Sequence, residues 1–125
     1  MIGEVLNLTV VAGRLVRPCA LRELNDGHRV LSLEVSPSGP EDRRAAPVPV
    51  AWLDPPSTAE TLDVGDEVVV VGRVHRRFFR AGGATQSRTE ISADLVVRAR
   101  QRSRVRRALT EVASSLDELM EFAAK

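Results

Sequence analysis

Gly65-Asp-Glu-Val-Val-Val-Val-Gly-Arg-Val-His-Arg-Arg-Phe-Phe-Arg80 is the stretch that decides the fold of this chain. Its residues 67–79 predict the longest β-strand, because valine is enriched in strands and alternate positions place Val68, Val70, Gly72 and Val74 on one face. Ala81-Gly-Gly-Ala84 predicts a flexible hairpin tip, and residues 88–97 predict the returning strand. The stretch therefore predicts a long hairpin that is basic and carries two adjacent rings, Phe78 and Phe79.

Three shorter strands precede this hairpin. Residues 5–16 are β-rich and partly alternating, and Gly13 indicates a bend of the kind that curled sheets use. Asn25-Asp-Gly27 is a tight-turn pattern, and residues 28–35 after it predict a strand with Leu31, Leu33 and Val35 on one face. Residues 36–47 hold three prolines and a glycine and predict a loop, and residues 48–53 predict the third strand.

The order of these elements predicts an all-β fold. Residues 54–62 predict a turn into a short helix, with Ser57 as its cap and Glu60 three residues later. Five strands with a short helix between the third and the fourth are the plan of an OB-fold barrel. We assign residues 1–98 to this barrel and residues 99–125 to a basic segment followed by a C-terminal α-helix.

The C-terminal segment changes its period from two to three and a half residues. Its apolar residues are spaced four and three apart, which predicts a helix of about three heptads. The seam, which we assign to oligomer contact, is Val105, Leu109, Val112, Leu116 and Leu119. Such a helix is marginal alone in water, so we expect it to pack on its own domain or on another subunit.

Arginines crowd the start of this helix. They are Arg98, Arg100, Arg102, Arg104, Arg106 and Arg107, and acidic residues follow them. Positive charge at a helix N-terminus opposes the macrodipole, so helix stability does not explain the cluster. Phosphate contact, a solvated arm and pairing with acidic residues of a second copy all stay open.

Composition narrows the classes of function. The net charge is only +1, from 18 basic and 17 acidic residues, so the distribution of charge must decide whether nucleic acid binds. Cys19 is the one cysteine, which excludes an internal disulfide and fits a reducing, cytoplasmic setting. The start of the chain lacks the pattern of a signal peptide, and we expect no membrane association. Metal-ligand spacing and a phosphate loop are both missing, so we expect no metal and no cofactor.

Several stretches, taken in order, resemble the bacterial single-stranded DNA-binding protein family. They are Asn7-Leu-Thr-Val-Val-Ala-Gly-Arg-Leu15, Leu21-Arg22, Gly27, Val50-Ala-Trp52, Ala59-Glu60, Gly65-Asp-Glu-Val-Val-Val-Val-Gly-Arg-Val74 and Thr89-Glu-Ile-Ser-Ala-Asp94. Their order and spacing across residues 5–97 carry the resemblance. It implies an OB-fold, dimers that pair into a tetramer, and single-stranded DNA wrapped across the barrel surface.

The resemblance also implies site residues. The family stacks bases on aromatic rings at four places, of which Trp52 matches one and Phe79 another. Ala46 or its neighbourhood stands at the third place, and residues 36–47 offer no ring for the fourth. The predicted DNA-binding set is Trp52, Phe79, Arg14, Arg22, Arg73, His75, Arg77, Arg80 and Arg88. Trp52 has two other readings, a core ring and a protein contact, and we expect Phe78 to point the other way and to pack.

The family's long flexible tail, with an acidic tip that ends in Phe, has no match here. Asp117-Glu-Leu-Met-Glu-Phe122 is acidic with a Phe, but Ala-Ala-Lys follows it. We therefore do not assign this segment the role of the tail, and the chain looks like a short, divergent paralogue of the family or like its tail-less primosomal relatives.

Two functions stand as hypotheses. The first is single-stranded DNA binding with little sequence specificity, in replication, recombination or repair, by a nucleoid-associated homodimer or homotetramer that contacts other replication or recombination proteins. The second is a protein-interaction module on the same fold, a primosome or accessory paralogue with weakened or lost DNA binding. We do not expect an enzyme, because a nuclease needs clustered carboxylates or a metal, and Glu90 and Asp94 alone do not provide them.

Overall fold

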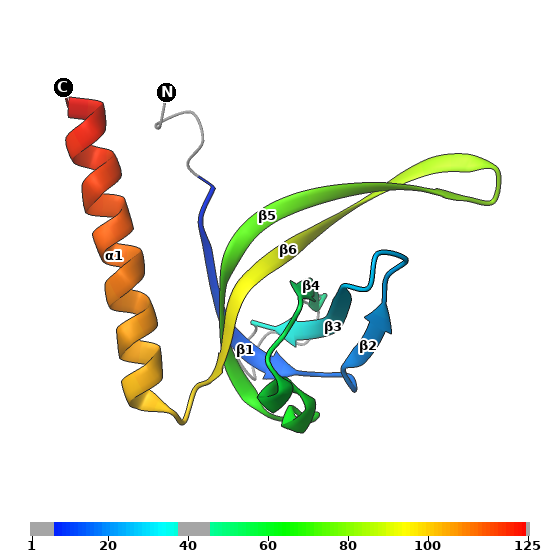
Figure 1. Ribbon diagram of the computed structural model, residues 1–125, viewed down its shortest axis with the longest axis horizontal. Helices are drawn as coiled ribbons and strands as arrows, with labels where there is room; N and C mark the ends of the chain where they lie inside the picture. Colours follow the sequence, from blue (N-terminus) through cyan, green and yellow to red (C-terminus); the bar gives the residue numbers. More distant parts are fainter. Residues whose placement is uncertain (1–6, 38–45, 125) are drawn as a thin grey trace.

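The strands close into a ring, as Figure 1 shows. The structure is a computed structural model, and it describes residues 7–37 and 46–124. Within these residues the strands are β1 (Thr9–Leu15), β2 (Ala20–Glu23), β3 (Arg29–Ser36), β4 (Val48–Leu53), β5 (Glu67–Ala81) and β6 (Ala84–Arg98). They follow the order β1-β5-β6-β4-β3-β2, and β1 also pairs with β3, which closes the barrel. The prediction of a β-barrel followed by a helix is confirmed in outline.

Two glycines allow the closure. β1 runs along β5 and then turns to pair with β3 at Arg14 and Ser36. A Cβ on Gly13 would lie 2.3 Å from the Ser36 carbonyl oxygen, so only glycine lets the two backbones approach this closely. Gly72 stands at an irregularity in the β5–β6 register, and its Cβ would lie 2.2 Å from the Ser92 oxygen. The bend predicted at Gly13 is therefore part of the barrel closure.

Alternating residues of the strands fill the barrel. The core contains Leu15, Leu31, Leu33, Val35, Val50, Trp52, Val68, Val70 and Ile91. Trp52 is 6% exposed and pairs with Leu31 across β3 and β4, so the expectation of a surface ring at Trp52 is wrong. The physical reason is the alternation of β4, because Val50 and Trp52 face inward while Leu53 is exposed. The apolar face that we read as a possible protein contact is the inner face of the barrel.

Three expectations about the smaller elements need correction. The short helix between β4 and β5 is a 3-10 turn, η2 (Ser57–Thr61), and Ser57 is its first residue rather than its cap. Pro56 holds the N-cap position and makes no side-chain cap hydrogen bond. β2 was not predicted, and it forms a hairpin with β3 through the predicted turn, where Gly27 has φ of 89°. The predicted loop at residues 36–47 lies mostly outside the described residues.

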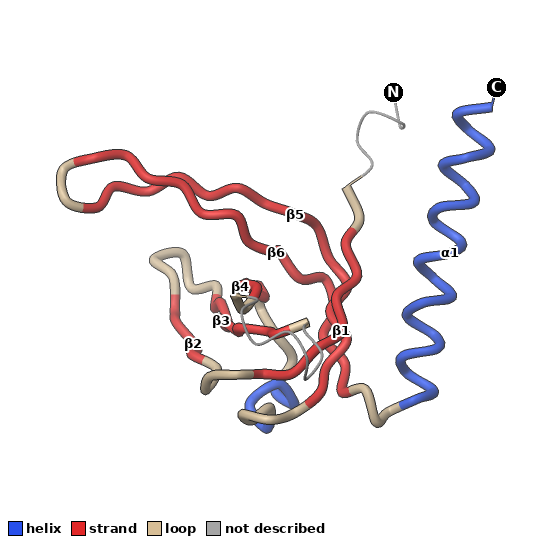
Figure 2. The backbone as a smooth tube through the Cα atoms, turned by 180° about the vertical axis from the view of Figure 1, so that it is seen from behind, coloured by secondary structure: helices blue, strands red, loops and turns tan. Residues whose placement is uncertain are grey.

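Two elements project from the barrel, on opposite sides of it (Figure 2). β5 pairs with β1 as far as Gly72, and β6 pairs with β4 from Ile91 onward. Residues 73–90 therefore pair only with each other, and we call this two-stranded extension the arm. The helix α1 (Arg102–Ala124) stands on the other side and contacts the sheet at β6. No helix in the described part of the chain combines the length and apolar character that crossing a membrane requires.

Candidate nucleic-acid interface

A groove of about 410 Å³ lies between the arm and the outer face of β2, β3 and β4. The arm overhangs these strands in Figure 1. Arg77, Arg88 and Glu90 line the groove from the arm, and Arg22, Ser32 and Ala51 line it from the barrel. Ser32 and Ala51 are cross-strand partners on the face opposite the core, so the groove lies on the outer surface of the barrel.

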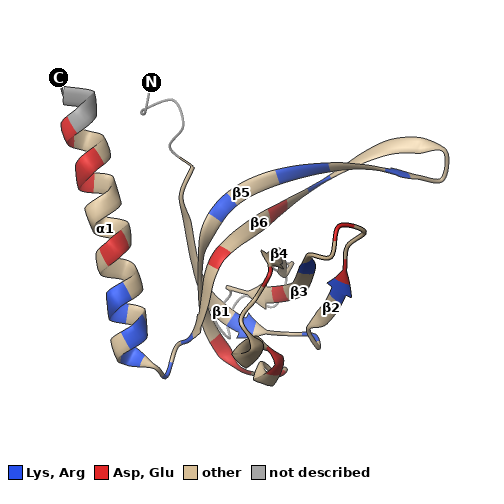
Figure 3. Cartoon of the chain, in the orientation of Figure 1, with Lys and Arg blue, Asp and Glu red and all other residues tan. Residues whose placement is uncertain are grey.

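The groove is basic, although the chain as a whole is almost neutral. Four arginines and two glutamates line it, which leaves a net charge of +2: Arg17, Arg22, Arg77, Arg88, Glu34 and Glu90. Figure 3 shows basic positions along the arm and on β2. Arg17 Nε lies 2.7 Å from Glu34 Oε2, and Arg77 Nε lies 3.4 Å from Glu90 Oε1. Within the described residues Arg22 and Arg88 take part in no ion pair, so they are the cations most available to an anion.

The register of the arm places like charges side by side. Arg77 and Arg88, which are both positive, are direct cross-strand partners. The next pair on the same face is His75 and Glu90. Like charges directly opposite each other destabilise a strand pair, and an anion between them would remove that cost. Phe79 shares this face, because the Arg77 guanidinium lies 5.6 Å from the centre of its ring. The prediction that His75, Arg77 and Phe79 share one face agrees with this register.

The arm exposes a ring on each of its faces. Phe79 is 36% exposed on the groove face, and Phe78 is 66% exposed on the other face, under the guanidinium of Arg76 at 6.0 Å. The expectation that Phe78 packs is therefore wrong. The arm is a single layer of two strands, and no other described element packs on either of its faces, so neither face buries a ring.

The other predicted arginines lie elsewhere. Arg14 is beside Glu67 at 3.6 Å, and Arg73 is beside Asp94 at 3.7 Å, and neither lines the groove. Arg80 donates a hydrogen bond of 3.2 Å to the Gly83 carbonyl at the hairpin tip. By alternation it shares the arm's other face with Phe78. These positions do not bring Arg14, Arg73 and Arg80 together with Arg77 and Arg88.

Sequence reasoning missed two contributors to this site. Arg17 lines the groove, but it lies between two predicted strands, where no alternation assigns it to a face. Asn7 holds the base of the arm, because its side-chain amide donates to the Val74 carbonyl at 2.8 Å and its oxygen accepts from the Val74 N–H at 2.9 Å. The amide thus continues the β1–β5 pairing two residues beyond Gly72, to Val74.

A second polar cluster lies where β4 ends. His28 Nδ1 lies 2.5 Å from Asp54 Oδ2, and Asp54 Oδ1 accepts a hydrogen bond of 2.9 Å from the Arg29 N–H. The hydrogen bond to Asp54 raises the pKa of the His28 imidazole, and the negative charge of Asp54 acts in the same direction. The bond from Arg29, followed by the one to His28, lowers the pKa of the Asp54 carboxyl. Neither residue lines the groove, so this pair ties β3 to the end of β4.

Reactive and metal-binding groups do not gather in the described part of the chain. Burial raises the pKa of the Cys19 thiol, and the charges of Asp63 and Asp66 raise it further, so the thiolate is disfavoured. Three or more His, Cys, Asp or Glu side chains in metal-binding proximity are not found among residues 7–37 and 46–124. Cations and a ring instead share the groove face of the arm, where Arg77 lies beside Phe79 and opposite Arg88.

Comparison with known proteins identifies the fold of this chain. No family model and no curated protein sequence matches this chain. Among solved structures, the chain is similar to the wild-type single-stranded DNA binding protein from Thermus aquaticus, with a TM-score of 0.59 and 23% sequence identity. The match covers 74% of this chain and 40% of that chain, so this chain spans well under half of that protein's length. The likeness shows that the barrel has the fold of that protein.

Proposed function

We propose that this protein binds single-stranded DNA with little sequence preference through the groove face of the arm. The observation that carries the proposal is the juxtaposition of Arg77, Arg88 and Phe79 on one exposed face. A phosphate between the two guanidinium groups would relieve their repulsion, and a base stacked on Phe79 would bury the exposed ring. The resemblance stated above and the fold similarity to the Thermus aquaticus protein support the same function.

Low specificity follows from the chemistry of the groove. Guanidinium groups hold phosphates, and a flat ring accepts any base, so neither contact reads a base edge. Arg22 on β2 continues the basic path on the barrel side. The proposed DNA-binding set is therefore Arg17, Arg22, Arg77, Arg88, His75 and Phe79.

The wider role is also part of the proposal. We propose a non-enzymatic function in the cytoplasm, in DNA replication, recombination or repair. The basic groove supports the binding part of this proposal. Fluorescence anisotropy of a labelled oligo-dT, read at 50 and 200 mM salt, tests the central claim. Salt-dependent binding is expected, and absent or salt-insensitive binding would contradict it.

The second candidate, an accessory module with weakened DNA binding, is favoured by one observation. Trp52 lies in the core, so the groove face has fewer rings than the resemblance implied. Each stacked base is worth about 1–3 kcal/mol, so a surface with fewer rings binds more weakly. Arg77→Ala/Phe79→Ala separates the two candidates: loss of DNA binding with unchanged assembly supports the first, and loss of assembly supports the second.

A further inference from the structure

The charges of α1 are divided between its two halves. The first two turns are basic, with Arg102, Arg104, Arg106 and Arg107, and the acidic residues follow them, with Glu111 before the middle of the helix and Asp117, Glu118 and Glu121 in its C-terminal half. Each end therefore carries the charge that the helix macrodipole disfavours, since anions stabilise N-termini and cations stabilise C-termini. No acidic residue lies in the first turn and no basic residue lies in the last. The helix carries a charge pattern that costs it stability when it stands alone.

The barrel covers only one flank of the apolar stripe of α1. Ala108 is buried, and so are Val69 and Val97, a cross-strand pair outside the core cluster. Together with the contact between α1 and β6, this indicates that the helix packs through Ala108 on the outer face of the sheet. The other flank is open: Leu109 is 42% exposed and Met120 is 69% exposed. The seam predicted for oligomer contact is thus half covered and half free.

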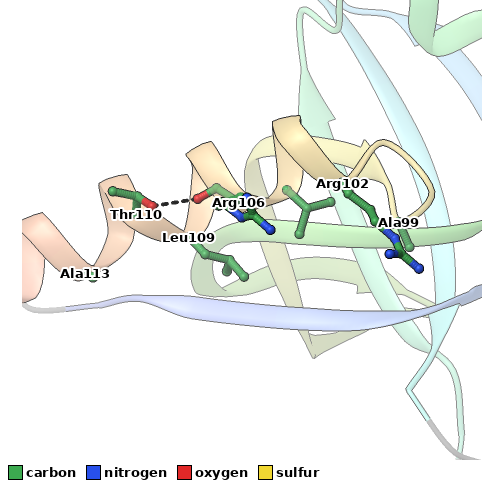
Figure 4. A pocket seen from close by; sticks show the side chains of 7 residues that line it. Ala99, Arg102, Arg106, Leu109, Thr110 and Ala113 are labelled. Atoms are coloured by element: carbon green, nitrogen blue, oxygen red, sulfur yellow. Dashed lines mark hydrogen bonds between the residues drawn. The ribbon is translucent and has the colours of Figure 1, made fainter.

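A hollow of about 520 Å³ lies along the free flank (Figure 4). Ala99, Val105, Leu109 and Ala113 form its apolar lining, and Arg102 and Arg106 border it. Figure 4 shows the Leu109 side chain projecting from the helix near the Thr110–Arg106 hydrogen bond of 2.8 Å. The free flank therefore combines apolar surface with a basic edge.

The same row of the helix continues into an acidic edge. Asp117 and Glu121 follow Ala113 at steps of four residues, the spacing that also separates Arg102 from Arg106. Both pairs span about 6 Å along the axis, at 1.5 Å per residue. Consider a second copy of α1 that lies antiparallel to the first, related to it by a two-fold axis at the level of Glu111 and Val112. Arg102 of one helix then lies level with Glu121 of the other, and Arg106 lies level with Asp117. In that register Leu109 of one copy falls between Val112 and Leu116 of the other.

We infer that a second copy of this chain covers the free flank, with the two α1 helices antiparallel. The antiparallel arrangement sets basic against acidic halves and opposes the two macrodipoles favourably. A parallel arrangement would set arginines against arginines and carboxylates against carboxylates, which costs free energy. A strand of nucleic acid would satisfy only the basic half and would leave the apolar flank uncovered. This inference does not depend on the proposed function.

Sedimentation equilibrium of the full chain at about 100 mM salt tests the pairing. The wild type is expected to be a dimer or a multiple of one, and Arg102→Glu/Arg106→Glu is expected to halve that mass. Glutamate is favourable at a helix N-terminus, so this variant keeps its helix and loss of mass cannot come from unfolding. Adding Asp117→Arg/Glu121→Arg to it restores the charge pairs and is expected to restore the mass.

Arg104→Glu/Arg107→Glu is the matched control, because both arginines project away from the free flank and carry the same charge change. It is expected to keep the wild-type mass. A monomeric wild type, an unchanged mass in Arg102→Glu/Arg106→Glu, or an equal loss in the control overturns the inference.

Cysteine cross-linking tests the orientation separately from any other self-association of the barrel. In a Cys19→Ser background, Val112→Cys is expected to form a disulfide between two copies, because residue 112 lies next to the proposed axis. Val105→Cys is expected to form none, because the two copies of residue 105 would be about 20 Å apart along the axis, against a Cα separation below 7 Å in disulfides. A disulfide at both positions indicates parallel helices, and a disulfide at neither indicates no pairing; either result overturns the inference.

Discussion

Replacing the two opposed arginines of the arm should reduce the salt dependence of DNA binding. A protein that neutralises Z phosphates of a single strand shows a slope of log K against log salt of about −0.7Z. Four arginines line the groove, so the wild type is expected near −2.8, and Arg77→Ala/Arg88→Ala near −1.4. Between 50 and 200 mM salt, the affinity of the wild type should fall about 50-fold and that of the variant about 7-fold.

The arm provides a matched control for this variant. Arg76→Ala/Arg80→Ala removes the same charge from the arm, but both arginines are on β5 and on the face that does not line the groove. Anisotropy titrations of an oligo-dT at four or more salt concentrations give both slopes. A slope that falls equally in both variants would refute the reasoning, because binding would then respond to the charge of the arm and not to its groove face.

The ring on the groove face should act differently from the arginines. Phe79→Ala is expected to weaken binding by about 5- to 150-fold, the equivalent of 1–3 kcal/mol of stacking, at every salt concentration. The slope should not change, because a ring displaces no counterions. Phe78→Ala on the opposite face is the control, and an equal loss in that variant would contradict the assignment of the groove face.

The remaining predictions concern three residues outside the groove. Trp52 is buried, so its fluorescence should change little when oligo-dT binds, and Trp52→Ala should cost about 3–5 kcal/mol of unfolding free energy in urea titrations; strong quenching would place the ring against bases instead. The raised pKa of His28 means that its bond to Asp54 stabilises the fold below the ordinary histidine pKa of 6.5 and loses this effect as pH rises through the folded value. His28→Gln should therefore lower the melting temperature more at pH 5.5 than at pH 8.5, and an equal loss at both would contradict this. Asn7→Ala removes both bonds to Val74 and should speed amide exchange at the base of the arm, while exchange in the core strands stays as in the wild type.

The alternation of apolar and polar residues predicted most of the strands of the fold. The alternation of Leu31, Leu33 and Val35, and the valine run that begins at Val68, predicted strands whose buried faces are those found in the barrel. Gly13 predicted a bend, and the close approach to Ser36 explains it. The four residues of β2 are too few to show a period, so nothing in the sequence marked them as a strand.

The site was harder to predict than the fold, because alternation divides a strand into two faces without saying which face is inside. For β4 the apolar face of Val50 and Trp52 was the signal for the core, and the resemblance outweighed it. For the arm, alternation alone was sufficient to predict that Arg77 and Phe79 share a face, and the β5–β6 register agrees with it. Arg17 lies in the loop between β1 and β2, and the course of that loop brings it to the groove. The course of a loop depends on contacts between distant parts of the chain, which the local sequence does not show.

The positions of the two surfaces connect the proposals. The arm, which lines the groove, projects from one side of the barrel, and α1 stands on the other side, as both backbone views show. Pairing through α1 would therefore leave two grooves open on one dimer. Two linked sites bind one long strand with an effective concentration in the millimolar range, which can raise the overall affinity by about 10²–10⁴ without any new contact. An avidity of this size is worth about 3–5 kcal/mol, and a stacked base is worth about 1–3 kcal/mol, so the avidity offsets the loss of at least about one ring. A surface with Phe79 as the ring on its groove face would thus depend on the helix behind it for tight binding.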